Sequence, residues 1–92
     1  MLGPLASLVT ASSALVKTGP GAVHGAILTA GSDAATLILY DNTSGTGTKV
    51  IGTIKAAINT TVGFSIPNGA AFSKGLYATI IGTSPEVTVV YS

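Results

Sequence analysis

The chain has 92 residues, of which 8% are charged, and its formal net charge is +1. Its four basic residues are all lysines. It therefore lacks arginine, the side chain that forks onto phosphate groups and guanine bases, and we expect no nucleic-acid partner. With no cysteine, one histidine and three acidic residues, the chain cannot assemble a Cys/His cluster that holds zinc, and we expect no metal and no cofactor.

Size and apolar composition indicate a small β domain. A chain of this length forms one domain that buries roughly 60–65% of its unfolded surface, so association with other chains is a further source of stability. The apolar residues are mostly Val, Ile, Leu and Ala, interrupted at short intervals by Thr, Ser and Gly, which favours pleated strands. No apolar run reaches the roughly 18 residues of a membrane-spanning helix, so we expect no membrane association. The sparse charge indicates a surface that other chains largely cover.

The first 16 residues are small and apolar, and they are predicted to form an N-terminal arm or a first strand. The first lysine, Lys17, follows this apolar stretch, whereas a signal peptide carries its positive charge in front, so no signal peptide is expected. A helix over residues 5–16 is also compatible with the pattern, and an arm could pair with the sheet edge of a neighbouring subunit. Residues 19–21, Gly-Pro-Gly, end this segment, and residues 17–92 are predicted to form the single β-sandwich domain.

The rest of the chain alternates between strand patterns and turn signals. In residues 61–66, for example, Val62, Phe64 and Ile66 share one face with the period of two that a strand requires. Turns are expected at residues 31–33, at Pro-Asn-Gly 67–69 and at residues 82–85. The predicted strands cover residues 22–29, 35–41, 49–56, 61–66, 76–81 and 86–91. Six to seven strands spaced about ten residues apart predict an all-β fold, a small antiparallel β-sandwich or jelly-roll-like barrel.

The polar loop 41–49 is the first place to look for chemistry, and it lacks a reactive partner. Asp41 opens the loop and is expected to accept local backbone hydrogen bonds in an Asx turn. The loop offers one carboxylate, whereas a calcium loop needs several oxygen ligands at set spacings. A Walker phosphate loop has its lysine directly after glycine and runs into a helix, but here Thr48 separates Gly47 from Lys49 and a strand follows.

The remaining candidates also favour structural roles. His24 lies on a predicted strand, where a lone histidine is typically a hydrogen-bonding residue; a catalytic triad would need a serine and an acid beside it in space. Residues 42–44 and 59–61 match the glycosylation pattern, as expected by chance in a Thr-rich chain without a signal peptide. We therefore assign no catalytic, cofactor-binding or metal-binding residue and expect the chain not to be an enzyme.

Several short motifs resemble a group of small tailed-bacteriophage virion proteins. Residues 16–25 are similar to the opening K-T-G-P-G-x-L-H-G of that group, with Val23 in place of the leucine before histidine. The resemblance continues through L-I-L-Y-D-N-T-S-G-T-G at residues 37–47, resumes with F-S-K-G-L-Y at residues 72–77 and ends with V-T-V-V-Y at residues 87–91. Glu86 stands where the group often has an acid, and residues 1–15 fall outside the match.

The resemblance implies a β-sandwich or jelly-roll-like fold and a structural place in the virion. The expected function is that of a capsid decoration, or cement, protein that binds the major capsid protein at the capsid surface and stabilises the head lattice. Proteins of that kind are small homo-oligomers, often trimers, and this chain would be made in the host cytoplasm. The alternative is a tail, neck or fibre component, including a receptor- or carbohydrate-binding module in which Tyr40, Tyr77 and Tyr91 would stack on sugars.

Overall fold

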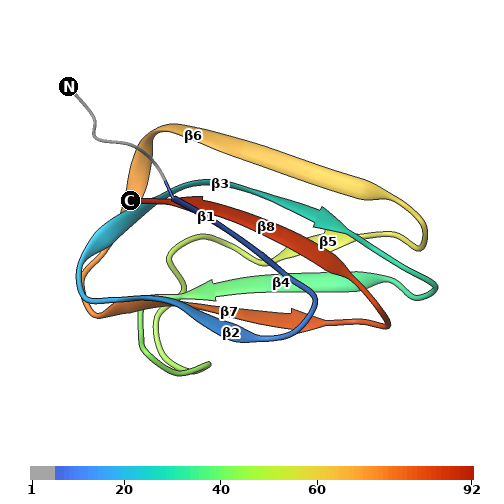
Figure 1. Ribbon diagram of the computed structural model, residues 1–92, viewed down its shortest axis with the longest axis horizontal. Coiled ribbons are helices and arrows are strands. Elements are labelled where there is room, and N and C mark those ends of the chain that lie inside the picture. The colour runs from blue at the N-terminus through green and yellow to red at the C-terminus, as the bar shows by residue number, and fades with distance from the viewer. Residues whose placement is uncertain (1–5) are drawn as a thin grey trace.

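The computed structural model describes residues 6–92 and is all-β. Its described part contains eight strands, against the six to seven predicted, and they form two four-stranded antiparallel sheets packed as a sandwich (Figure 1). The strands are β1 (Ala6–Thr10), β2 (Ala14–Thr18), β3 (Gly21–Thr29), β4 (Ala35–Tyr40), β5 (Ile54–Ala56), β6 (Thr61–Phe72), β7 (Gly75–Ile81) and β8 (Glu86–Tyr91).

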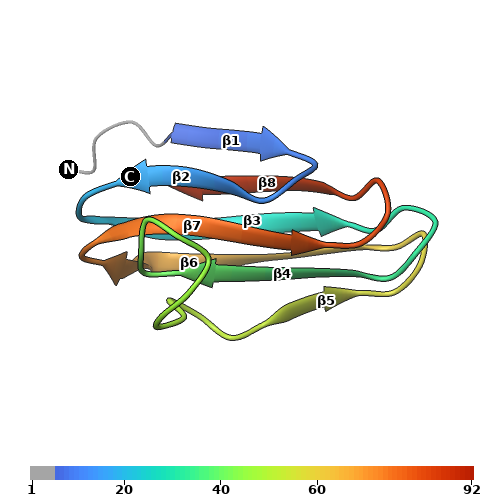
Figure 2. The ribbon, with the colours of Figure 1, turned by 90° about the horizontal axis from the view of Figure 1, so that it is seen from below.

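The strand order is that of an eight-strand jelly roll. Sheet 1 has the order β1-β8-β3-β6 and sheet 2 the order β2-β7-β4-β5, and the two lie one behind the other in Figure 2. β1 pairs with β8, β2 with β7, β3 with β6 and β4 with β5, all antiparallel. The chain is thus one long hairpin with the β4–β5 loop at its tip, rolled up so that β3 also pairs with β8 and β4 with β7.

The core lies between the sheets and follows from the alternation along each strand. In β4, Ala35, Leu37 and Leu39 are buried, whereas the intervening side chains are half-buried on the outer face. Full burial of a leucine or valine side chain is worth roughly 1.5–3 kcal/mol each. The largest fully buried side chains are Leu28, Leu37, Leu39, Leu76, Val23, Val87 and Val89.

The predicted N-terminal arm is part of the sandwich over its described residues. β1 pairs with β8 in sheet 1, and β2 pairs with β7 in sheet 2, so residues 11–13 carry the chain from one sheet to the other (Figure 1). Residues 6–10 and 14–18 form two strands in place of the single first strand predicted, and the helix alternative is wrong there. β2 runs across residue 16, so a strand spans the proposed boundary. Residues 1–5 of the predicted arm lie outside the described residues.

The predicted strand 49–56 is shorter in the structure. Lys49 forms an isolated bridge with Tyr40, and the Val50 N–H donates to the carbonyl of Leu39 at 2.8 Å. Regular pairing begins again only at β5, with Ile54 opposite Leu37. The residues between bulge out of the ladder, which the alternating pattern alone does not reveal.

The turn predicted at residues 67–69 is instead a wide bulge inside β6. Val23 lies opposite Ala70 and Gly25 lies opposite Ser65, so four residues of β6 face a single residue of β3. The strand assignment continues on both sides of the bulge because β3 supplies pairing partners there. Proline is tolerated at this point because β6 is an edge strand, where a missing N–H breaks no ladder.

Candidate functional site

Asp41 is a structural residue that joins two distant turns. Its Oδ1 accepts hydrogen bonds from the backbone N–H groups of Lys74 at 2.9 Å and Ser73 at 3.0 Å, and its Oδ2 accepts one from the Ser73 hydroxyl at 3.4 Å. These bonds lower the pKa of Asp41, first through Lys74 and also through Ser73 and Gly75, against an opposing effect of partial burial. The prediction of a local Asx turn is therefore wrong. The Asp41 carboxylate accepts its backbone hydrogen bonds from the β6–β7 turn.

Asn42, the next residue, organises the loop itself. Its Oδ1 accepts from the Thr43 N–H at 2.8 Å and its Nδ2 donates to the Thr46 carbonyl at 2.9 Å. The loop then folds over the outer face of sheet 2, in front of β7 and β4 in Figure 2. A Cβ at Gly45 would lie 3.0 Å from the Thr79 hydroxyl and 3.3 Å from the Tyr77 ring. The loop covers sheet 2 and presents no reactive group there.

His24 is also bound into the fold. Its Nε2 lies 3.1 Å from the Ser92 hydroxyl, and no acidic side chain among residues 6–92 hydrogen-bonds to the ring. The structure therefore pairs histidine with serine but brings no third member of a triad to them. Over the same residues, no group of three or more His, Asp or Glu side chains is close enough to hold a metal ion.

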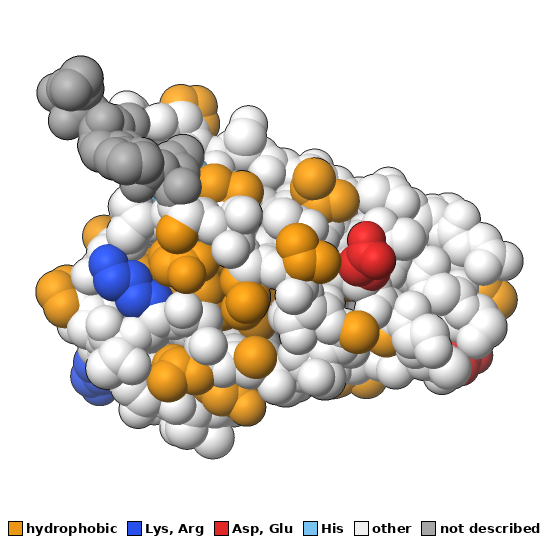
Figure 3. Space-filling model, viewed as in Figure 1, with side chains coloured by type: hydrophobic (Ala, Val, Ile, Leu, Met, Phe, Trp, Pro, Cys, Tyr) orange, Lys and Arg blue, Asp and Glu red, His pale blue; other side chains and the backbone are white. Residues whose placement is uncertain are grey.

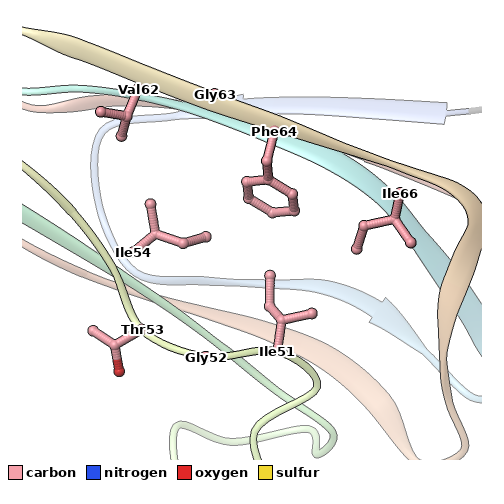
Figure 4. A pocket seen from close by; sticks show the side chains of 8 residues that line it. All are labelled: Ile51, Gly52, Thr53, Ile54, Val62, Gly63, Phe64 and Ile66. Atoms are coloured by element: carbon pink, nitrogen blue, oxygen red, sulfur yellow. The ribbon is translucent and has the colours of Figure 1, made fainter.

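An apolar groove lies between the free edges of β5 and β6, and we call it the edge groove. It has a volume of about 500 Å³. Val62, Phe64 and Ile66 reach into it from β6, while Ile51 and Ile54 point toward them from the opposite side (Figure 4). All five side chains are only half-buried, and Gly52, Thr53 and Gly63 complete the lining.

The groove exists because sheet 2 is incomplete at this edge. β6 presents twelve residues, whereas β5 presents three, so much of the inward face of β6 has no strand across from it. The chain between Lys49 and Ile54 leaves the ladder of β4 and partly fills that gap. Its Ile51 side chain points into the groove beside Ile54 (Figure 4). In a regular strand over residues 49–56, Ile51 and Ile54 would point to opposite faces because they are three positions apart, so the sequence pattern identifies only the β6 side of the groove.

The chemistry of the edge groove is limited to apolar contact. Its lining contains one hydroxyl, Thr53, and no titratable side chain, and Thr53 points away from the cavity (Figure 4). General acid–base or nucleophilic chemistry needs titratable or activated groups in reach of a substrate. The arrangement can therefore bind an apolar surface and exclude water, but it offers no group to react.

Exposed apolar side chains occur on other faces as well. Val9 and Ile27 flank Thr88 on the outer face of sheet 1, with exposed fractions of 61% and 49%. Leu15 and Ile81 are exposed on sheet 2, and Ile58 is exposed in the β5–β6 connection. Figure 3, which looks onto the edge formed by β1 and β2, shows hydrophobic side chains gathered between these strands and few charged ones.

Two of the three tyrosines meet on sheet 2. Tyr40 and Tyr77 are direct cross-strand partners and are half-buried on its outer face. Tyr91 lies in the other sheet and packs against the core. The tyrosines therefore do not form one continuous platform.

Residues 6–92 include no helix that is long and apolar enough to cross a bilayer. Comparisons of the chain with protein-family models, with curated protein sequences and with solved structures find no match.

Proposed function

We propose that this chain is a structural virion protein, a capsid decoration protein that binds the phage head lattice as a homo-oligomer, with a trimer favoured. The motif resemblance over residues 16–92 supports this proposal. The low charge supports it too, because a chain with 8% charged residues has few charges with which to keep its surface soluble on its own. In this proposal the protein is no enzyme and has the major capsid protein as its partner at the capsid surface.

The observation that carries the proposal is the pair of free edges at opposite ends of the sandwich. β1 and β2 form one edge, and β5 and β6 form the other, where the edge groove lies. Free edges and half-buried apolar grooves are typically covered in native assemblies. A contact between unlike edges of neighbouring copies is heterologous, and such contacts close into a ring when the rotation permits. We assign the edge groove to the contact between copies.

Stabilisation of the head then follows from mass action. A protein that binds the assembled lattice and not its separated subunits shifts the equilibrium toward the lattice. The contacts would be apolar surfaces and strand edges, which depend little on salt, because ion pairs between exposed charges are the contacts that salt screens. Binding to heads should therefore persist at high ionic strength.

The first experiment tests the contact between copies. Light scattering after size exclusion should give a trimer for the wild type and a monomer for Ile51→Lys, because a charge in the groove must be desolvated on association. The matched control Ile58→Lys introduces the same charge at an exposed residue outside the groove and should stay trimeric. A monomeric wild type, or an Ile51→Lys variant that remains trimeric, would contradict the assignment of the groove.

The second experiment tests the place in the virion. Purified protein is added to heads that lack it, and bound copies are counted by gel densitometry and particle imaging. Decoration requires a copy number comparable to the number of lattice sites of one symmetry type. A handful of copies per particle, or density at the tail alone, would reject decoration in favour of a tail, neck or fibre component.

A second candidate function has one specific observation in its favour. Tyr40 and Tyr77 are paired on the outer face of sheet 2, and the parts of their rings that Gly45 of the loop leaves uncovered are an aromatic surface of the kind that stacks on sugars. A receptor- or carbohydrate-binding tail component would need them. Under that alternative, the free protein protects host cells from infection and Tyr77→Ala abolishes the protection; under decoration, the free protein has no such effect.

A further inference from the structure

The bulge of β6 contains the sequence Asn68-Gly69, and the proposed function assigns no role to these two residues. Asn68 is exposed, and the bulge, residues 66–69, stands opposite His24 alone. The side chain of Asn68 makes no hydrogen bond to another described residue, so its amide is free to rotate toward the backbone of Gly69.

Gly69 is required at its position by the fold. Its φ is +77°, in the left-handed region, and a Cβ there would lie 3.0 Å from the Ala22 Cβ and 3.0 Å from Cε1 of His24. A side chain at residue 69 would therefore be strained and would collide with β3. The same lack of a side chain leaves the Gly69 nitrogen unhindered beside the Asn68 amide carbon.

We propose that Asn68 is a site of spontaneous deamidation through a succinimide. The Gly69 backbone nitrogen bonds to Cγ of Asn68, the Cγ–Nδ2 bond breaks, and the nitrogen leaves as ammonia with the proton from Gly69. Water then opens the ring at either carbonyl and gives aspartate or isoaspartate, so the balance is one water consumed and one ammonia released. Nucleophile and electrophile are held in adjacent residues, so the step needs no catalyst beyond hydroxide.

The other two asparagines differ from Asn68 in the residue that follows them, and the backbone N–H of that residue is hydrogen-bonded in both. In each, the next residue is a threonine, whose branched side chain crowds the attacking nitrogen. The Thr43 N–H is hydrogen-bonded to the Asn42 Oδ1 at 2.8 Å. The Thr60 N–H is hydrogen-bonded to the Ala57 carbonyl at 3.1 Å. The chain thus contains two internal controls for reactivity at Asn68.

The modification changes the charge balance of the whole chain. One added carboxylate reduces the formal net charge from +1 to zero, and a net charge near zero promotes association in solution. An isoaspartate also adds a backbone atom to the bulge, next to the ring of His24. Aged protein is therefore expected to differ from fresh protein both in charge and in the β3–β6 pairing around residue 24.

The experiment is timed peptide mapping of the full chain at mildly alkaline pH. A mass gain of about 1 Da, from NH₂ to OH, should accumulate in the peptide that contains Asn68. Conversion there should be at least about tenfold faster than at Asn42 and Asn59, which corresponds to a barrier lower by about 1.4 kcal/mol. In Asn68→Gln, this fast component should disappear while the fold and the slow sites stay unchanged.

A parallel series in denaturant separates the fold from the motif. Faster conversion at Asn42 or Asn59 than at Asn68 in the folded protein would overturn the proposal. It is equally overturned if Asn68 converts in denaturant but remains intact in the folded protein, because the bulge would then protect the amide. Mapping reads covalent chemistry only, so its outcome is independent of whether the protein decorates heads.

Discussion

The carboxylate of Asp41, at the end of β4, accepts a 2.9 Å hydrogen bond from the backbone N–H of Lys74 in the β6–β7 turn. The two residues are 33 positions apart, so this bond forms only once β4 lies beside β7 and brings the two turns together. A hydrogen bond from a backbone N–H to an ionised carboxylate is stronger than one between neutral groups. Asp41 therefore links the β4–β5 loop, at the tip of the hairpin, to the β6–β7 turn.

The first prediction concerns how the stability contributed by the Asp41 hydrogen bonds depends on pH. The folded-state pKa of Asp41 is lowered from 3.8, so its contribution to stability is fully present above the unfolded-state pKa and is lost as pH falls through the lowered folded-state pKa. Asp41→Asn should melt at a lower temperature than the wild type at neutral pH, and this difference should shrink in acid. Thermal unfolding followed by circular dichroism across the acid range measures this difference.

The control for the Asp41 prediction is Glu86→Gln, at an exposed acid, which should show no such trend. A difference for Asp41→Asn that is independent of pH would contradict the assignment.

The second prediction concerns the core. Leu37→Ala should lower the free energy of unfolding by about 2–5 kcal/mol, because it removes a fully buried side chain and leaves a cavity. Ile81→Ala, at a side chain that is 57% exposed, should stay within about 0.5 kcal/mol of the wild type. Urea denaturation of both variants gives the comparison. Similar losses for the two variants would show that the core does not lie between the sheets as described.

The third prediction concerns the close approach of β3 and β6. A Cβ at Gly25 would stand 2.6 Å from the backbone carbonyl oxygen of Phe64, so Gly25→Ala must push the two strands apart. Overpacking of this kind costs about 1–3 kcal/mol. Gly52→Ala is the matched control because its Cβ would meet nothing within 4 Å. Chemical denaturation should separate the two variants, and equal stability would mean that β6 does not lie at this distance from β3.

The fourth prediction concerns β1. Removal of residues 1–10 deletes the strand that pairs with β8 from Thr10↔Val87 to Ala6↔Tyr91, so it should lower the melting temperature and promote aggregation through the newly free edge of β8. Removal of residues 1–5 leaves β1 in place and serves as the control. Melting curves and size exclusion distinguish the two shortened chains. If both behave alike, residues 6–10 do not contribute to the sandwich.

The sequence predicted the interior of the sheets better than their edges. β3, β4, β7 and β8 match the predicted strands to within about one residue because each has a buried face that imposes a period of two. The edge strands deviate for reasons of pairing. β1 and β2 contain no turn signal as strong as Gly-Pro, yet they belong to different sheets because β8 and β7 offer separate partners.

The candidate site was predicted only in part. Val62, Phe64 and Ile66 were recognisable as one apolar face, but a pattern cannot show that the facing strand is only three residues long. Ile51 joins Ile54 in the groove because the chain leaves the ladder between the Tyr40–Lys49 bridge and β5. The partners of Asp41 are likewise set by topology, which local spacing does not encode.

The nested pairing of the strands has a consequence for the order of folding. The β4–β5 pair closes the shortest stretch of chain and the β1–β8 pair closes the longest, and the entropy lost on closing a loop rises with its length. Once an inner pair of strands has formed, the next pair outward has to order only the connecting residues between the two pairs, so its closure loses less entropy. The hairpin should therefore zip from its tip, so that changes near Leu37 slow folding while changes in β1 chiefly accelerate unfolding. Folding is therefore expected to begin at the β4–β5 pair, on either side of the polar loop 41–49.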